Sequence, residues 1–238
     1  MSNYLILNEK SKKRLSFFEA VNFFSLNIHG EKPLTEGLAR RLYSKKNLPI
    51  SPYLHHFLDE ENKHMIYFAG FCLRYASKIY PDKKMSIPQE YEPGEEDFLF
   101  FAKVLIFEEI VDVFNIQMSR DERLEPITRE INRLHHRDES RHLVFGREIV
   151  VGLFDEYKDQ WSEMTLEKIR TYLAQYLLVT WKEYFNPDVY KDSNLLDPYD
   201  ITDRVFDSSV CRTRRVEITA NCIRFLLKNG ILEKEPPL

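Results

Sequence analysis

The middle of a long helical pattern holds the stretch His135-His136-Arg137-Asp138-Glu139-Ser140-Arg141-His142. On a helix, the spacing i, i+4, i+7 places His135, Glu139 and His142 on one face, one turn apart. That face is otherwise apolar, because its stripe continues through Ile131 and Leu153. Two imidazoles and a carboxylate therefore point where a core is expected. Burying them is costly unless a partner satisfies them, and a metal ion would do so.

A second helical pattern carries a similar unit, Glu61-x-x-His64, on a stripe with Leu54, Phe57 and Phe68. Glu-x-x-His on an inward face is the ligand unit of di-iron and di-manganese four-helix bundles, which need two such units and one further Glu from each of two other helices. The alternative for either unit is a solvated glutamate beside a hydrogen-bonded core histidine. The presence of both units on apolar faces favours the metal interpretation.

Composition favours a single soluble domain spanning residues 1–238. The chain has 238 residues, a net charge of −4 and 30% charged residues, and this length is enough for one substantial core. The basic residues are scattered, so no nucleic-acid partner is expected. Three cysteines far apart in the chain indicate reduced thiols in the cytoplasm. No signal peptide and no membrane-spanning run is expected.

Few glycines and no sustained two-residue alternation predict an all-α chain. Gly30 and Pro33 are read as a helix stop, and Pro126 suits the first turn of a helix. The helices are expected over residues 11–28, 34–45, about 52–80, 126–154, 165–185 and 213–228, with one more that starts near 95 and continues through 114, and with a loop over 83–94. Asn186-Pro187 is read as a helix stop and turn.

The two further carboxylates come from the first and third helices. The third is apolar around nearly its whole circumference but contains Glu108 and Glu109, and either could face inward. In the first helix Glu19 lies among aromatic residues, although an exposed glutamate explains it equally well. Glu36 is a poorer candidate because it begins a short polar helix.

Together these motifs resemble the p-aminobenzoate N-oxygenase (AurF-like) family of ferritin-like non-haem di-iron oxygenases. The resemblance covers most of the chain and is carried by Glu61-x-x-His64-Met65, an isolated Glu in the third helix, His135-x-x-x-Glu139-x-x-His142, and Asn186-Pro187-x-Val189-Tyr190. The extra histidine one turn before the second Glu-x-x-His is the most specific feature. The resemblance implies a ferritin-like helical bundle with additional C-terminal helices.

The resemblance also implies a ligand set and a chemistry. The implied metal ligands are Glu19, Glu61, His64, Glu108, His135, Glu139 and His142, with Glu109 as the alternative to Glu108 and with an insertion assumed between Glu19 and Glu61. The cofactors would be two Fe ions, with O₂ as co-substrate, an external electron donor (a protein or a reductant) and a peroxo intermediate. No catalytic residue beyond the ligands is implied, and a homodimer is expected.

The leading function is then N-oxygenation of an aryl or amino-acid-derived amine, a small-molecule substrate, in a biosynthetic pathway. The alternatives are a C–H hydroxylase or desaturase on the same di-iron core, a ferritin-like iron oxidase or storage protein, and a metal-free helical interaction module. Asp138 is expected either to accept a hydrogen bond from a ligand histidine or to be an ordinary surface residue.

Overall fold

The computed structural model describes residues 7–82 and 90–238, and every regular element in these residues is a helix. The main helices are α1 (Glu9–Arg41), α2 (Ser51–Phe71), α3 (Glu95–Arg120), α4 (Pro126–Tyr157), α5 (Glu163–Tyr184) and α8 (Ser209–Lys228). The short elements are η2 (Leu48–Ile50), the π-helical turn η3 (Cys72–Ala76), α6 (Pro187–Asp192) and α7 (Pro198–Phe206). The expected all-α, ferritin-like bundle with additional C-terminal helices is confirmed.

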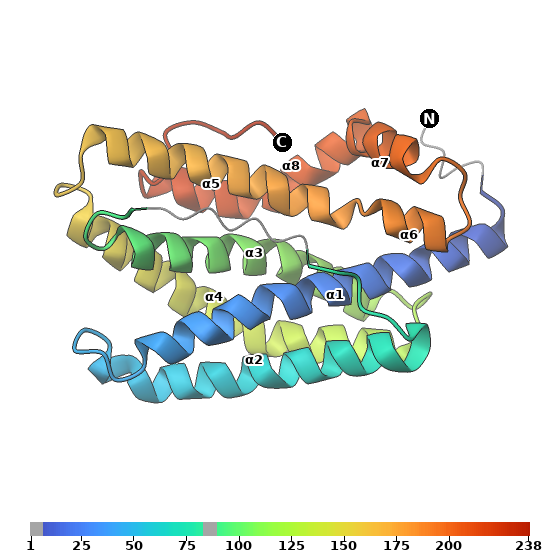
Figure 1. Cartoon of the computed structure of the whole chain (residues 1–238), viewed down its shortest axis with the longest axis horizontal. Coiled ribbons are helices and arrows are strands. Elements are labelled where there is room, and N and C mark those ends of the chain that lie inside the picture. The colour runs from blue at the N-terminus through green and yellow to red at the C-terminus, as the bar shows by residue number, and fades with distance from the viewer. Residues whose placement is uncertain (1–6, 83–89) are drawn as a thin grey trace.

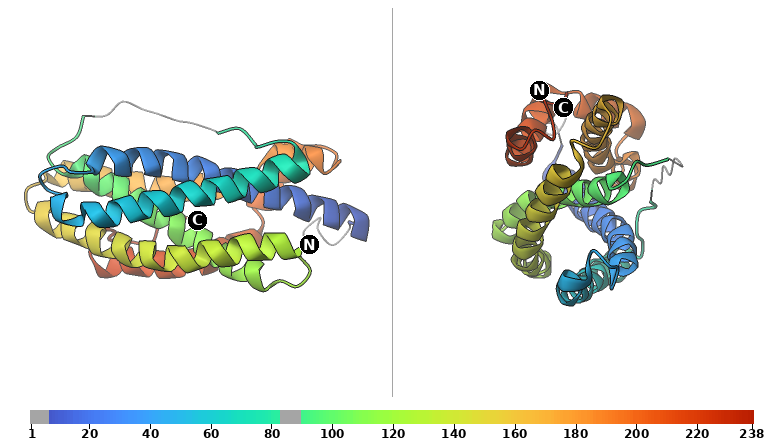
Figure 2. Two further views of the ribbon diagram at one scale, coloured as in Figure 1. Left: turned by 90° about the horizontal axis from the view of Figure 1, so that it is seen from below. Right: turned by 90° about the vertical axis from the view of Figure 1, so that its left-hand side faces the viewer.

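Helices α1 to α4 form the bundle, and α3 is its most enclosed member (Figure 1). Helix α5 packs on α1 and α3, and α8 packs on α3. These later helices lie on the side of the bundle opposite α2, as the end-on view shows (Figure 2). The apolar circumference of α3 follows from this position, because neighbours surround it on several sides. Helices α2 and α4 lie side by side on the uncovered side.

Helix α1 differs from the sequence prediction, because it is one helix through residues 9–41 with Pro33 inside it. The predicted stop at Gly30 was wrong for a packing reason. A Cβ at Gly30 would lie 2.5 Å from the ring of Phe107 on α3, so this glycine allows the two helices to approach closely. Gly37 has the same role against Phe100. Pro33 costs one backbone hydrogen bond, and burial of Leu34 and Leu38 beyond it holds the helix together.

Two other predicted boundaries change. Helix α2 ends at Phe71, earlier than the predicted Tyr80, and the π-helical turn that follows leads to Ser77 in the left-handed region (φ 54°). Asn186 starts a helix as well as following one, because its side chain accepts a hydrogen bond from the Asp188 N–H at the start of α6. Most of the predicted loop, residues 83–89, lies outside the described residues.

Candidate metal centre

Four helices bring seven acidic and imidazole side chains together in the middle of the bundle, and none is more than 3% exposed. They are Glu31 of α1, Glu61 and His64 of α2, Glu108 of α3, and His135, Glu139 and His142 of α4. Donor atoms of three overlapping trios from this set lie within 4.8 Å of one another. Such proximity of like charges in a core requires a compensating group.

The two Glu-x-x-His units face each other across the α2–α4 contact. Glu61 places Oε2 3.3 Å from Nδ1 of His64 and Oε1 2.9 Å from Nδ1 of His142. Glu139 similarly lies between these two rings, with Oε1 3.5 Å from Nδ1 of His64 and Oε2 3.2 Å from Nδ1 of His142. Both carboxylates therefore occupy the space between two imidazoles that come from different helices.

His135 completes one end of the cluster. Its Nε2 lies 3.1 Å from Glu139 Oε1 and 3.5 Å from Glu31 Oε1. Its other nitrogen, Nδ1, lies 2.9 Å from the side-chain amide of Asn115, whose Oδ1 has no hydrogen-bond partner in the part of the chain that the structure describes. Exchanging the amide oxygen and nitrogen by rotation makes Oδ1 the acceptor of an Nδ1–H bond. That arrangement leaves the lone pair of Nε2 facing the cluster.

The carboxylate from the first helix is Glu31, and the expected choice of Glu19 is corrected. Glu31 is fully buried and lies 3.8 Å from Nδ1 of His64, whereas Glu19 is only half-buried and belongs to none of the trios. The two glutamates are separated by about 18 Å along the axis at 1.5 Å per residue. Glu31 lies twelve residues closer to Glu61 than Glu19 does, so the gap that called for an insertion becomes shorter. Glu36 is exposed and pairs with Arg40.

The two adjacent acids of α3, Glu108 and Glu109, have different surroundings, and only Glu108 lies in the cluster. Glu108 faces the cluster, where it forms a trio with His135 and Glu139, and neither of its oxygens has a hydrogen-bond donor among the described residues. Glu109 belongs to none of the trios and forms an ion pair with Arg147 of α4. The geometry therefore favours Glu108.

The outward nitrogens of two histidines are held by carboxylates from the opposite helix. His64 Nε2 lies 3.3 Å from Asp138 Oδ2, so the expected hydrogen bond from a cluster histidine to Asp138 is present. His142 Nε2 lies 3.0 Å from Glu60 Oε2. An N–H donated outward fixes the tautomer and leaves Nδ1 free to bind a metal ion. Glu60 was not predicted from the sequence, although its place directly before Glu61 repeats the Asp138–Glu139 pair.

Electrostatics show that protein atoms alone do not satisfy the cluster. Burial raises the pKa of Glu31 well above its usual value, and the neighbouring carboxylates raise it further. Burial, Glu139 and Glu61 have the same effect on the pKa of Glu108. Across residues 7–82 and 90–238, no Lys or Arg pairs with the four cluster glutamates, and both oxygens of Glu31 and Glu108 lack donors. Two divalent cations would balance four carboxylates, so the residues fit a di-metal centre.

The metal-free protein is expected to lose stability as the pH rises. Burial lowers the pKa of His142, but Glu139 and Glu61 outweigh it and raise that pKa above 6.5, and the pKa values of Glu31 and Glu108 are raised above 4.5. Groups whose folded pKa is raised stabilise the fold at low pH and lose this contribution as pH rises through the folded pKa. The free energy of unfolding of the metal-free protein should therefore fall between pH 6.5 and 8. Urea unfolding at several pH values, with and without metal, measures this, and an equal slope in both forms would contradict it.

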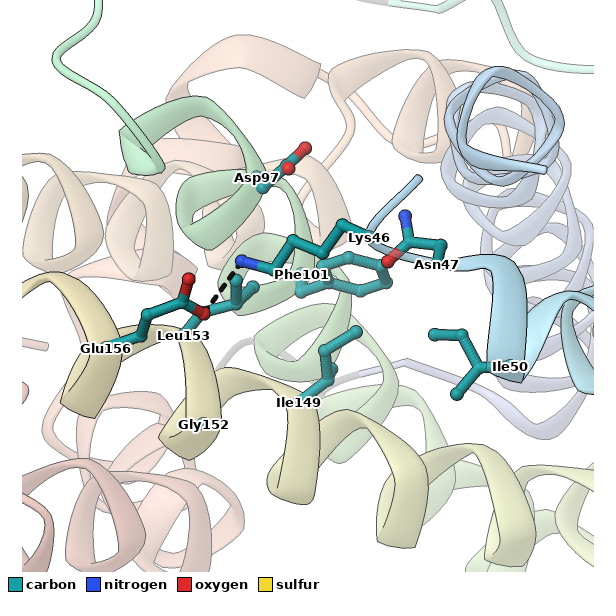
Figure 3. Close-up of a pocket in the computed structure, with 9 residues that line it drawn as sticks. All are labelled: Lys46, Asn47, Ile50, Asp97, Phe101, Ile149, Gly152, Leu153 and Glu156. Carbon is teal, nitrogen blue, oxygen red and sulfur yellow. Dashed lines mark hydrogen bonds and ion pairs between the residues drawn. The ribbon is translucent and has the colours of Figure 1, made fainter. Parts of the chain in front are cut away.

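Two clefts lie away from the cluster. A cleft of about 280 Å³ lies at one end of the bundle, where Lys46 pairs with Glu156 above the ring of Phe101 (Figure 3). None of the seven cluster side chains lines it. A row of rings joins the two places: Phe101 contacts Phe145, Phe145 contacts Phe57, and Phe57 stacks on His142 with centroids 3.8 Å apart. Aromatic side chains thus separate the cluster from the cleft.

A helical bundle with two facing Glu-x-x-His units and a further Glu from each of two other helices defines the ferritin-like carboxylate proteins that bind two metal ions. Within that class, the model of the p-aminobenzoate N-oxygenase (AurF) family matches residues 2–230. The chain therefore belongs to this family, which places it among di-iron oxygenases and so among oxidoreductases. Neither a curated protein nor a solved structure was found to match. Among the described helices, none combines the length and apolar character needed to cross a membrane.

Proposed function

We propose that this protein is an O₂-dependent di-iron oxygenase that transfers oxygen to the nitrogen of a small amine. The observation that carries the proposal is His135, a third buried imidazole in a cluster that already contains two complete Glu-x-x-His units. Together with membership of the N-oxygenase family, it favours N-oxygenation over a C–H hydroxylase or desaturase. An iron-storage role is less favoured, because α5 and α8 cover a side of the bundle.

The contacts support one arrangement of ligands. Glu61 and Glu139 would be shared, since each lies between His64 and His142. Glu31 and His64 would complete one metal position, and His135 lies within reach of both positions, because it forms one trio with Glu31 and His64 and another with Glu108 and Glu139. His142 and Glu108 would complete the other. Two ferrous ions held in this way would supply two electrons for the reduction of O₂, and electrons for later turnovers would come from a donor protein or a small reductant.

The protein contributes exclusion of water and fixed orientation. All seven ligands are buried, and Asp138, Glu60 and Asn115 hold the outward nitrogens of the three histidines. Fixed ligands in a dry site need little reorganisation when charge moves during reaction.

The side of the centre near Glu108 is where we place the substrate. The ring centroids of Tyr184 and Trp181 of α5 are 5.4 Å apart. Tyr184 Oη and Trp181 Nε1 are buried without hydrogen-bond partners among the described residues. Burial raises the pKa of Tyr184 well above its usual value, and the nearby charge of Glu108 adds to this shift. Unpartnered polar atoms on aromatic side chains near Glu108 suit an amine that offers a hydrogen bond.

Product analysis after a single turnover tests the function. The protein is loaded with Fe²⁺, mixed with O₂ and 4-aminobenzoate or a panel of aryl and aliphatic amines, and the products are separated by mass and by the position of the new oxygen. The proposal expects oxygen on nitrogen. Oxygen on carbon, or a new double bond, would support the hydroxylase or desaturase alternative. Progressive mineralisation of iron without an organic product would support storage.

Glu108 and its neighbour Glu109 form a matched pair for mutation. Glu108→Ala should lower the iron content by about one ion per chain, because it removes a carboxylate that no described residue pairs with. Glu109→Ala should retain iron but reduce stability by about 3 kcal/mol or less, because it leaves Arg147 without its partner. Metal analysis and thermal unfolding of both variants distinguish these effects, and retention of full iron by Glu108→Ala with loss in Glu109→Ala would reverse the assignment.

A further inference from the structure

The two carboxylates that hold His64 and His142 share one cation, the guanidinium of Arg141. Its Nη2 donates to Oε1 of Glu60 and lies 3.1 Å from Oδ1 of Asp138. Glu60 in turn accepts from His142, and Asp138 accepts from His64. We propose that Arg141 is a positioning residue that controls both metal positions together. This inference rests on the proposed di-metal centre.

The connections cross between helices, so Arg141 also fixes the register of α2 against α4. Glu60 belongs to α2 but holds His142 of α4, and Asp138 belongs to α4 but holds His64 of α2. These two helices lie side by side on the face that α5 and α8 leave uncovered (Figure 2). A shift of either helix would therefore move one imidazole relative to the carboxylates on the other helix.

Arg141 is the shared member, and each carboxylate also has a partner of its own. Glu60 Oε2 lies 3.2 Å from Nε2 of His56, and Asp138 Oδ1 lies 3.0 Å from Nε of Arg137. The carboxylates are nearly buried, with side chains 9% and 11% exposed, whereas the Arg141 side chain is 45% exposed. Loss of Arg137 or His56 should consequently disturb one histidine, whereas loss of Arg141 should disturb two.

Binding of Co²⁺ to metal-free protein tests the inference without any turnover. Calorimetry and the visible absorption of bound Co²⁺ report both binding steps. In Arg141→Gln both affinities should fall, by about tenfold or more, which is the usual effect of removing support from ligand histidines. Arg137→Gln should weaken one step only. Arg133→Gln is the matched control, because Arg133 also lies on α4 and forms an ion pair, but with Glu130 on its own helix and away from the cluster.

A double-mutant cycle separates positioning from general stability. If Arg141 acts through Glu60 and Asp138, Arg141→Gln should add no further loss of Co²⁺ affinity to the Glu60→Gln/Asp138→Asn protein, because coupled residues are not additive. An additive loss, or an Arg141→Gln protein that matches wild type in both steps, would overturn the inference. If Arg141→Gln does not fold, Glu60→Gln and Asp138→Asn must each weaken one step, and failure of either to do so overturns it. A wild-type protein that binds no Co²⁺ would instead overturn the metal centre itself.

Discussion

Glu31→Ala is expected to lower bound iron from about two ions to about one per chain and to abolish oxygenated product. Glu31 is fully buried, lies 3.5 Å from His135 Nε2 and 3.8 Å from His64 Nδ1, and has no hydrogen-bond donor at either oxygen within residues 7–82 and 90–238. Its removal leaves two imidazoles without the carboxylate that neutralises the first metal position. Iron analysis and single-turnover product yield measure both effects. Glu19→Ala, the same substitution on the same helix, should leave both unchanged.

Glu31→Gln gives a second and more selective result, because the amide keeps the shape but not the charge. In the metal-free protein, burial and the charges of Glu61, Glu108 and Glu139 raise the pKa of Glu31, so a neutral group there should increase the free energy of unfolding at neutral pH. With metal present the same variant should be less stable than wild type, because one ligand is weakened. If Glu31 had only a packing role, the change in the free energy of unfolding caused by Glu31→Gln would keep its sign when metal is added. An equal change in both forms would therefore contradict a ligand role.

The patterns that the sequence revealed are those contained within one helix. The stripes through Glu61 and His64 and through His135, Glu139 and His142 need only helical periodicity and apolar neighbours, and the structure buries all five side chains at one place. The two stripes could face each other only in a bundle, so the fold class followed from the same observation.

The predicted end of the first helix was wrong because local sequence signals contradicted the tertiary structure. Gly30 and Pro33 form a sequence pattern typical of a helix end. In the structure Gly30 instead allows close contact with Phe107, and Pro33 is tolerated because the helix is packed on both sides of it. Glu31 therefore fell in an assumed turn. A continuous helix would have placed Glu31 on the same stripe as Phe24 and Leu38, both fully buried, and this periodicity was the available signal.

Residues that support the ligands were harder to find, because their roles depend on how two helices are rotated against each other. Glu60 and Asn115 look like ordinary helix residues, and only the α2–α4 and α3–α4 contacts bring them to His142 and His135. Asp138 was a candidate because it precedes Glu139, but its partner, His64, lies on another helix. Periodicity identifies the face of a helix and leaves its neighbour undetermined.

His135→Ala is expected to retain the fold and at least one bound iron, yet to lose most of the N-oxygenated product. His135 is 1% exposed and reaches both Glu139 and Glu31 through Nε2, while Asn115 holds Nδ1. Its imidazole would be the third nitrogen around the cluster, in a place that water would otherwise fill. Iron content, product yield and the absorbance changes that follow mixing of ferrous protein with O₂ measure the effect.

His136→Ala is the matched control, because His136 is the next residue of α4, is half-buried, and pairs with Asp112 at 2.7 Å rather than with the cluster glutamates. If His135 were only a hydrogen-bonded core residue, its loss would cost stability of about 1–3 kcal/mol and leave oxygen chemistry intact. If His135 is a ligand, imidazole added to His135→Ala should enter the vacated space and restore part of the product yield. Added imidazole cannot replace a purely structural contact to Asn115. Unchanged product yield in His135→Ala would remove the reason to separate this centre from ordinary two-histidine di-iron carboxylate sites.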